Sequence, residues 1–244
     1  MKSIIPNTLT SLNLACGCLA VLSFLNHFYY LGIILIFIST IADFFDGFAA
    51  RLLNVQSDMG KELDSLADMV SFGFVPGTIL YITFCKANHI ASFQEIIETQ
   101  NYLPFLGFLV TIFSAVRLAK FNTDKRQTNS FIGLPTPANT LFFLTIPLIW
   151  INQSLDKELW YEVIIANNIF LITTTLLSSY LLIAELPLIA LKFKGGGFNQ
   201  NIYRYILLLL GIICIITLNY LAIPVILILY VALSLIEVLF KEQV

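Results

Sequence analysis

The chain alternates long apolar runs with short polar connections. Because each run approaches the roughly 20 residues that a helix needs to cross a bilayer, each is predicted to be a membrane-spanning helix. The expected spans are residues 8–25, 30–50, 61–85, 103–121, 136–152, 163–184, 203–218 and 221–240. The polar start, residues 1–7, is short, so the apolar run after it is expected to be a span rather than a removable leader.

The composition agrees with this pattern. Of the 244 residues, 58% are hydrophobic and only 11% are charged, whereas a soluble domain carries about 25% charged residues. The four cysteines lie within or at the end of apolar runs, where they are expected to be packing residues rather than zinc ligands or disulfide partners. The predicted fold class is therefore an all-α, polytopic integral membrane protein with about eight transmembrane helices.

Lysine and arginine are distributed unevenly between the two sides of this topology. The termini and the even-numbered connections hold 11 of the 13 Lys and Arg residues, and only Lys86 and Lys157 fall on the other side. Because cytoplasmic loops carry an excess of these residues, both termini are expected to be cytoplasmic. We expect a multi-pass protein of the cell (inner) membrane.

Six acidic residues interrupt the apolar pattern between residues 42 and 70. They are Asp43, Asp46, Asp58, Glu62, Asp64 and Asp68. Most lie next to segments expected in lipid, where an ionised side chain is costly. The pattern indicates a functional site, which the predicted topology places at the cytoplasmic face.

Helical spacing gathers most of these acids on two faces, since each residue turns the helix by about 100°. One face of the first helix carries Asp43, Asp46, Gly47, Ala50 and Arg51. One face of the next carries Gly60, Asp64 and Asp68, and eight residues connect the two motifs. Two antiparallel helices would therefore present four carboxylates to each other across a narrow gap. Asp58 and Glu62 fall off these faces and are expected to be solvated.

Four neighbouring carboxylates would repel one another unless a cation lay between them. Oxygen ligands suit Mg²⁺, Mn²⁺ or Ca²⁺ better than zinc or copper. The small residues Gly47, Ala50 and Gly60 leave room for a ligand near the backbone, and Arg51 offers a planar cation suited to phosphate. Together these residues predict a metal-dependent diphosphate site.

The motif Asp-x-x-Asp-Gly-x-x-Ala-Arg, then eight residues, then Gly-x-x-x-Asp-x-x-x-Asp, resembles the signature of the CDP-alcohol phosphotransferase family. The resemblance implies a six-helix core, residues 1–184, followed by a cytoplasmic loop and a C-terminal transmembrane hairpin, residues 185–244. It also implies a homodimer. The implied reaction is attack by an alcohol on a lipid-linked phosphorus, with release of CMP.

The same resemblance implies a role for each signature residue. Two ions of Mg²⁺ or Mn²⁺ would be held by Asp43, Asp46, Asp64 and Asp68. Asp68 would also be the general base that activates the acceptor hydroxyl. The CDP-binding pocket would be formed by Asp46, Gly47, Ala50, Arg51 and Gly60.

Other stretches are similar to the phosphatidylserine synthase branch of that family. They are "SLADMVSFGFVPG" at 65–77, "FSAVRLAKFN" at 113–122, "FIGLPTPAN" at 131–139 and "ELPLIALKFKG" at 185–195. This likeness implies transfer of the phosphatidyl group from CDP-diacylglycerol to L-serine, giving phosphatidylserine and CMP. Lys120, where this branch commonly has arginine, and Glu185, at an often neutral or basic position, depart from the branch pattern.

The acceptor site has several candidate residues. Arg117 could bind the serine carboxylate or be an ordinary cytoplasmic cation, and Lys120 is a possible helper, with Lys125 and Arg126 beyond it. Gly133 and Pro135 could shape the pocket or simply form a turn before a span.

Asn13 and the two histidines complete the candidates. Asn13, within the first span, could orient a ligand carboxylate or Arg51, or bond another helix. His27 and His89 fall on the opposite side of the membrane from the acids, so neither is expected to be catalytic.

Two rival functions remain open at this point. The first is the same chemistry with another acceptor, such as glycerol 3-phosphate or inositol phosphate. The second is a divalent-cation transporter, since intramembrane carboxylates also mark ion pathways. A transporter predicts acids spread through the depth of the bilayer, whereas these cluster at one face.

Overall fold

The computed structural model describes residues 3–123, 131–152, 160–189 and 201–241. Its longer helices are α1 (Ile4–Leu25), α2 (Tyr29–Leu52), α3 (Asp58–Asp68), α4 (Val75–Ala87), α6 (Phe108–Thr123), α7 (Thr136–Ile151), α9 (Asn168–Ile183), α10 (Ile202–Leu218) and α11 (Ala222–Lys241). The shorter elements are η1 (Met69–Phe74), α5 (Phe93–Thr99), η2 (Leu103–Gly107), β1 (Phe131–Ile132), α8 (Trp160–Ile165), β2 (Pro187–Leu188) and η5 (Asn219–Leu221).

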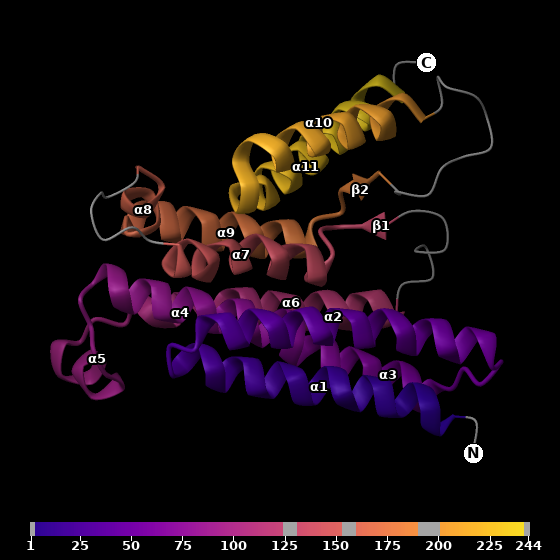
Figure 1. Cartoon of the computed structure of the whole chain (residues 1–244), viewed down its shortest axis with the longest axis horizontal. Helices are drawn as coiled ribbons and strands as arrows, with labels where there is room; N and C mark the ends of the chain where they lie inside the picture. The colour runs from indigo at the N-terminus through magenta and orange to yellow at the C-terminus, as the bar shows by residue number, and fades with distance from the viewer. Residues whose placement is uncertain (1–2, 124–130, 153–159, 190–200, 242–244) are drawn as a thin grey trace.

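The helices lie in three layers. Figure 1 shows α1 to α4 and α6 in the first layer, α7 and α9 in the second, and α10 and α11 crossing the outer side of the second. The beginning of α1, the α2–α3 connection and the end of α11 lie at one end of the molecule, and α5 and α8 lie at the other. This arrangement agrees with the all-α prediction and with a polytopic membrane protein.

The helices differ in how well they match a bilayer. Five are long and apolar enough to cross one, namely Ile4–Leu25, Tyr29–Leu52, Asp58–Ala87, Leu103–Thr123 and Ile202–Val238. Thr136–Ile151 and Asn168–Ile183 are shorter apolar helices. Every predicted span contains a helix, and the last two predicted spans are the arms of Ile202–Val238, which η5 divides. The number of crossings and the side on which the termini lie stay predictions.

Two predicted boundaries are corrected by capping. The predicted span 163–184 begins at Asn168, because the Asn167 side chain accepts hydrogen bonds from the amides of Ile169 and Phe170 and so starts a new helix. The predicted span 61–85 begins at Asp58, where the Ser57 hydroxyl accepts from the amide of Gly60.

The long helix 58–87 contains a π-helical segment, η1, directly after Asp68. Pro76 follows it, and since proline has no N–H it cannot donate to the carbonyl one turn earlier, that of Phe72. The Thr140 hydroxyl of α7 donates to that carbonyl at 2.9 Å, and the Thr111 hydroxyl of α6 donates to the carbonyl of Gly73 at 3.0 Å. Side chains of two neighbouring helices thus hold η1 in place.

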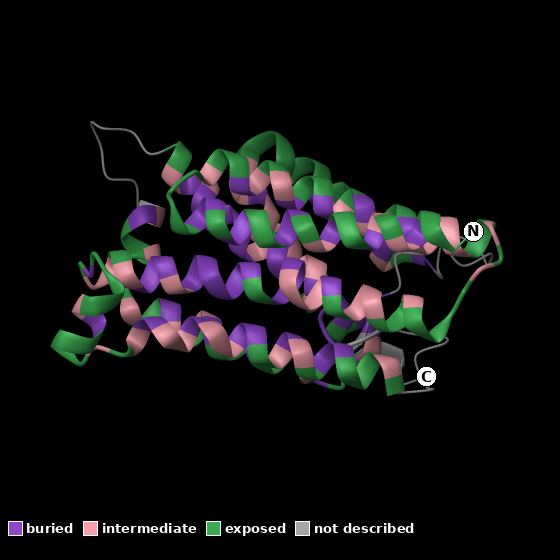
Figure 2. Cartoon of the chain, turned by 90° about the horizontal axis from the view of Figure 1, so that it is seen from below, coloured by how far each residue is buried: buried purple, intermediate pink, exposed green. Residues whose placement is uncertain are grey.

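The core lies among α1, α4, α6, α7 and α9. Its largest fully buried side chains include Phe24, Phe72, Phe84 and Phe143. Figure 2 shows buried residues along the inner faces of the long helices and exposed ones on the opposite faces. Because many exposed side chains are large and apolar, these outer faces suit contact with lipid.

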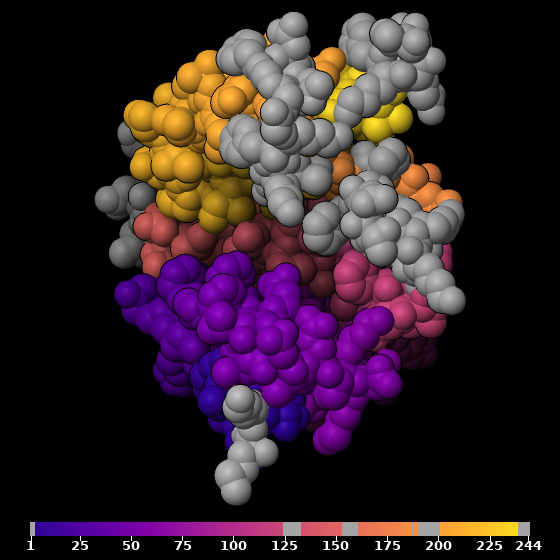
Figure 3. Space-filling view, turned by 90° about the vertical axis from the view of Figure 1, so that its right-hand side faces the viewer, coloured from indigo at the N-terminus to yellow at the C-terminus, as the bar shows by residue number. Residues whose placement is uncertain are grey.

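A short antiparallel pair of strands, which the sequence pattern does not predict, joins the second layer to the hairpin of α10 and α11. Phe131 pairs with Leu188 and Ile132 with Pro187. Strands of two residues are too short to show a period-2 pattern, so hydropathy cannot reveal them. Figure 3, viewed from the end that carries α3, shows α1 to α3 on one side of α7 and the hairpin on the other.

The packing around η1 gives a prediction for stability. Thr140→Val keeps the shape of the buried side chain but leaves the carbonyl of Phe72 without its donor. We expect the free energy of unfolding to fall by about 1 kcal/mol, measured by thermal or denaturant unfolding in detergent. Thr174→Val is the matched control, because the exposed Thr174 hydroxyl bonds only the carbonyl of Phe170 in its own helix. Equal losses in the two variants would contradict this account of η1.

Candidate metal and substrate site

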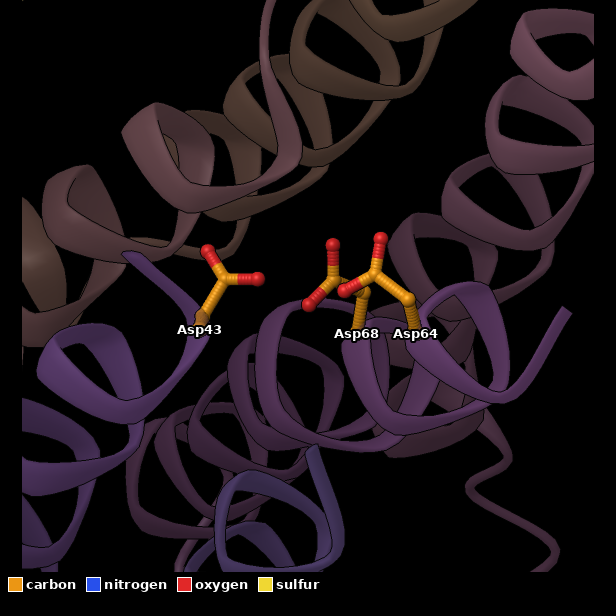
Figure 4. A group of neighbouring side chains, drawn as sticks. All are labelled: Asp43, Asp64 and Asp68. Carbon is orange, nitrogen blue, oxygen red and sulfur yellow. The ribbon is translucent and has the colours of Figure 1, made fainter. Parts of the chain in front are cut away.

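Three carboxylates meet where α2 passes α3. Oxygen atoms of Asp43, Asp64 and Asp68 all lie within 4.8 Å of one another, and the three residues are partly buried. Figure 4 shows Asp43 approaching from α2 and the other two from α3, with their carboxylates facing a common space. The structure therefore brings together three of the four acids that the helical faces predict.

The fourth acid, Asp46, is nearby but differently engaged. It is 5% exposed, and its Oδ2 accepts a hydrogen bond from the Thr10 hydroxyl of α1 at 2.5 Å. Its charge lies close enough to Asp43 and Asp64 to interact with both. Asp46 thus borders the three-carboxylate cluster, and its role as a metal ligand stays a prediction.

Helix α1 forms a wall of the site that the two-helix expectation lacked. The Asn13 amide donates to Oδ1 of Asp68 at 3.1 Å, and its own Oδ1 accepts from the Ser39 hydroxyl at 2.5 Å. Asn13 therefore bonds both a carboxylate of the site and a neighbouring helix. Sequence reasoning missed Thr10, although Thr10 and Asn13 stand three apart in an apolar run, a spacing that puts two polar side chains on one helix face.

The α2–α3 connection sets the positions of the two motifs. Asn54 has a left-handed backbone conformation, with φ of 52°, at the point where the chain turns away from α2. Asparagine adopts this conformation more readily than most residues. The Ser57 cap then starts α3 about two turns before Asp64 reaches the cluster. The eight-residue connection between the motifs is therefore a turn followed by a helix cap.

The cluster fits a divalent cation. Asp64 Oδ1 is buried and has no hydrogen-bond partner among the described residues. A buried oxygen of this kind is costly unless a proton donor or a cation satisfies it. Hard carboxylate oxygens are the ligands that Mg²⁺ and Mn²⁺ prefer. Asp43, Asp64 and Asp68 could therefore bind a metal ion.

The residues expected to bind CDP lie beside this cluster on α2 and at the start of α3. Arg51 is exposed, and its Nε donates to the carbonyl of Gly47 at 3.0 Å. Among the described residues, a Cβ at Gly47 would meet only the Arg51 guanidinium, at 3.9 Å, so the described part of the chain leaves the space over this turn open. Ala50 is half-buried, while a Cβ at Gly60 would lie 3.2 Å from the Ser57 hydroxyl. The open turn leaves room for a ligand next to the arginine.

Arg117 lies on the other side of Asp68, on α6. It is 7% exposed, its Nε has no hydrogen-bond partner among the described residues, and its charge lies close enough to interact with that of Asp68. An exposed cytoplasmic cation would not be buried in this way, so the structure favours a specific role for Arg117. Lys120 is exposed one turn later, and Lys125 and Arg126 lie outside the described residues.

Two hydrogen bonds also join α6 to α3. The Lys61 ammonium donates to the carbonyl of Asn122, and the Asn122 amide donates to the Ser65 hydroxyl at 2.8 Å. Both bonds join the exposed side of α3 to the end of α6. They keep the helix that carries Arg117 next to the helix that carries Asp68.

The loop before α7 contains Gly133 and Pro135. Gly133 has φ of 76°, and a Cβ there would lie 2.9 Å from the carbonyl oxygen of Leu182, so only glycine fits. Its amide donates to the carbonyl of Leu186 at 3.0 Å. Pro135 stands directly before the first residue of α7. The loop is thus a constrained turn built against the segment that follows α9.

An apolar groove of about 470 Å³ opens between α1 and α2. Its lining includes Leu9 and Leu12 of α1 and Ala42 and Phe45 of α2. These residues are sequence neighbours of the polar side chains that form the carboxylate site. The groove therefore lies along α1 and α2, two of the three helices that form the site.

The remaining polar candidates lie apart from the cluster. Asp58 and Glu62 are exposed on α3, in agreement with a solvated face. His27 lies in the α1–α2 turn and His89 follows α4, both at the opposite end of the molecule from the cluster.

The family comparison covers most of the chain. The family model for CDP-alcohol phosphatidyltransferase matches residues 3–193. The match includes every acid of the cluster and the loop before α7, and it ends before α10. The limit proposed for the family core, residue 184, is not tested by this match and stays a prediction.

Relatives of this chain from three organisms share the same name. A CDP-diacylglycerol–serine O-phosphatidyltransferase of Bacillus subtilis is 40% identical over 137 residues, which are 54% of this chain and 69% of that protein. Proteins of the same name from Mycobacterium leprae and Methanocaldococcus jannaschii are 30% and 36% identical, over 76% and 57% of this chain. This chain spans 58% of the length of each of these two relatives. On the extent of the family match, the chain belongs to the CDP-alcohol phosphatidyltransferase family.

Proposed function

We propose that the chain transfers the phosphatidyl group of CDP-diacylglycerol to L-serine, giving phosphatidylserine and CMP. The observation that carries the proposal is the meeting of Asp43, Asp64 and Asp68, at signature spacing, in a member of this family. The names of the relatives support serine as the acceptor.

The reaction exchanges one phosphorus–oxygen bond for another. The serine hydroxyl oxygen bonds to the phosphorus of the phosphatidyl group, the bond from that phosphorus to CMP breaks, and CMP leaves with the electron pair. Asp68 takes the hydroxyl proton as the general base. Asn13 supports this role, because its amide bonds Oδ1 of Asp68 and so holds the carboxylate in one orientation.

Asp43, Asp46, Asp64 and Asp68 are proposed to hold two ions of Mg²⁺ or Mn²⁺. When bound, such ions neutralise charge on diphosphate oxygens and favour departure of the leaving group. Arg51 binds the same diphosphate from the exposed turn of α2, while Gly47, Ala50 and Gly60 leave space for the nucleotide.

Arg117 is proposed to bind the serine carboxylate. Its burial and its Nε, which has no hydrogen-bond partner among the described residues, support this role, since a buried N–H without an acceptor is costly. Lys120, Gly133 and Pro135 complete the acceptor side. The groove between α1 and α2 supports a lipid donor, because it offers apolar surface for an acyl chain beside the site.

The protein is proposed to lie in the cell (inner) membrane with the site at the cytoplasmic face. The excess of Lys and Arg at that end of the predicted topology supports this orientation. Soluble CMP and serine would then exchange with the cytoplasm while the acyl chains stay in the bilayer. We also propose that the chain forms the homodimer that family resemblance implies.

The first test measures CMP release by purified protein in detergent, with CDP-diacylglycerol, Mn²⁺ and one of serine, glycerol 3-phosphate or inositol phosphate. We expect release with serine, and a loss of about 10²- to 10⁴-fold in kcat for Asp68→Asn because the general base is removed. Asp58→Asn, an exposed acid at the start of the same helix, is the control and should keep activity. Release with a different alcohol would overturn the acceptor, and metal binding without release would favour the cation transporter.

A second test measures Mn²⁺ binding directly, by electron paramagnetic resonance or titration calorimetry. Asn13→Ala should weaken binding about 10- to 100-fold, the usual effect of losing a partner of a ligating group, and Asp64→Asn should weaken it at least as much. Glu62→Gln on the exposed side of α3 is the control. Unchanged affinity in Asp64→Asn would show that the cluster is not the metal site.

A third test separates a serine contact from a general cationic role for Arg117. Arg117→Gln should raise the KM for serine about ten- to a hundredfold, the effect of losing a charged hydrogen bond of about 1.5–3 kcal/mol. The KM for CDP-diacylglycerol should stay the same. Lys86→Gln, which removes a cation at the far end of the bundle, should change neither value. A change in the lipid KM alone would place Arg117 on the donor side.

A further inference from the structure

The hairpin of α10 and α11 lies outside the residues matched by the family, yet it is bonded to the core at a specific point. Ile189, directly after β2, donates its amide to the Ser234 hydroxyl at 3.1 Å and accepts at its carbonyl from the Tyr230 hydroxyl at 3.1 Å. Both polar backbone groups of one buried residue are therefore bound by α11. Figure 1 shows β2 beneath the hairpin, where these bonds form.

Tyr230 and Ser234 are suited to this task by their spacing. They stand four residues apart and so occupy one face of α11. Ser234 is fully buried, and its hydroxyl also donates to the carbonyl of Tyr230 at 2.7 Å. In a helix that is otherwise strongly apolar, hydroxyls of this kind are costly unless they are bonded. General packing of a lipid-facing hairpin would not require them.

Ile189, which Tyr230 and Ser234 bond, lies in the segment that supports the loop containing Gly133. β2 pairs with β1, the Gly133 amide donates to the carbonyl of Leu186, and the Leu134 amide donates to the carbonyl of Leu181, both at 3.0 Å. The carbonyl oxygens of Leu182 and Ala184 lie so close to Gly133 that this turn has no free space around it. A displacement of the segment 181–189 must therefore displace the loop.

The loop in turn leads to the carboxylate site. Pro135 precedes α7 and accepts the amide of Asn139, and Thr140, on the first turns of α7, donates to the carbonyl of Phe72. Phe72 lies one turn beyond Asp68 on the same helix. Hydrogen bonds, together with the short chain segments between them, therefore connect α11 through the Gly133 loop to the helix that carries Asp68.

We propose that Tyr230 and Ser234 are positioning residues, which hold the Gly133 loop in the place required to bind the amino-acid acceptor. This inference rests on the proposed function for the identity of the acceptor. It assigns the C-terminal hairpin a role in acceptor binding. The donor lipid, proposed to lie along α1 and α2, and the metal ions, proposed to lie between α2 and α3, should be unaffected.

The kinetic test compares Tyr230→Phe and Ser234→Ala with wild type. Each should raise the KM for serine about three- to tenfold, the range expected for the loss of one hydrogen bond, with kcat and the KM for CDP-diacylglycerol unchanged. Tyr220→Phe is the matched control. It removes a hydroxyl from the same hairpin, one that bonds the Tyr161 hydroxyl at the opposite end of the molecule.

Hydrogen exchange gives a readout that does not depend on which alcohol the enzyme uses. In Tyr230→Phe, the amides of Gly133 and Leu134 should exchange about three- to tenfold faster than in Tyr220→Phe, while α1 and α2 exchange at the wild-type rate. Unchanged exchange at these two amides would overturn the inference even if serine is the substrate.

Two other outcomes are decisive. Faster exchange throughout the protein together with a lower unfolding temperature would reduce both residues to general stability and overturn the inference. If the wild type releases CMP with another alcohol, the proposed acceptor is wrong. In that case, a raised KM for that alcohol with faster exchange at Gly133 supports the positioning role, and an unchanged KM overturns it.

Discussion

The repulsion among the carboxylates between α2 and α3 is the constraint on which the rest of the structure depends. Asp43, Asp64 and Asp68 come within 4.8 Å of one another inside a bundle whose outer faces are apolar. Like charges at this separation repel one another. The polar side chains of α1 relieve part of this cost, since Thr10 bonds Asp46 and Asn13 bonds Asp68. A bound cation would relieve the remainder, so folding of this end of the bundle and metal binding should be coupled.

The carboxylates of the site could be predicted because the residues that determine their arrangement are close together in the sequence. Spacings of three and four residues decide which acids share a helix face. The connection between the motifs is short enough to keep the two faces next to each other. The wall formed by α1 could not be predicted in the same way. A polar residue within an apolar run, such as Asn13, shows only that it needs a partner, and the partner is chosen by tertiary packing. For that reason the sequence left Asn13 with three alternatives and missed Thr10.

The fold shows the same division between local and distant information. Hydropathy predicts all the long helices, but it misplaces the start of α9, which depends on the Asn167 cap. It also misses the β1–β2 pair, whose partners are separated by more than fifty residues and are only two residues long. The positive φ of Gly133 could have been suspected from the Gly-Leu-Pro sequence, but not the carbonyls that enclose it. Contacts between distant segments, rather than the elements themselves, are what the pattern leaves out.

Hydroxyl-to-backbone bonds provide much of the specific cohesion between the layers. Lipid is as apolar as the helices, so hydrophobic burial does little to join one helix to another, and polar contacts and close packing must do it. Proline and the π-helical turn leave carbonyls of η1 for Thr140 and Thr111, and the end of β2 leaves both groups of Ile189 for Tyr230 and Ser234. In each case an irregular segment of backbone is fixed by a hydroxyl from another helix. Irregular backbone at this depth is tolerated only when it is satisfied in this way, which ties the geometry of the site to the packing of all three layers.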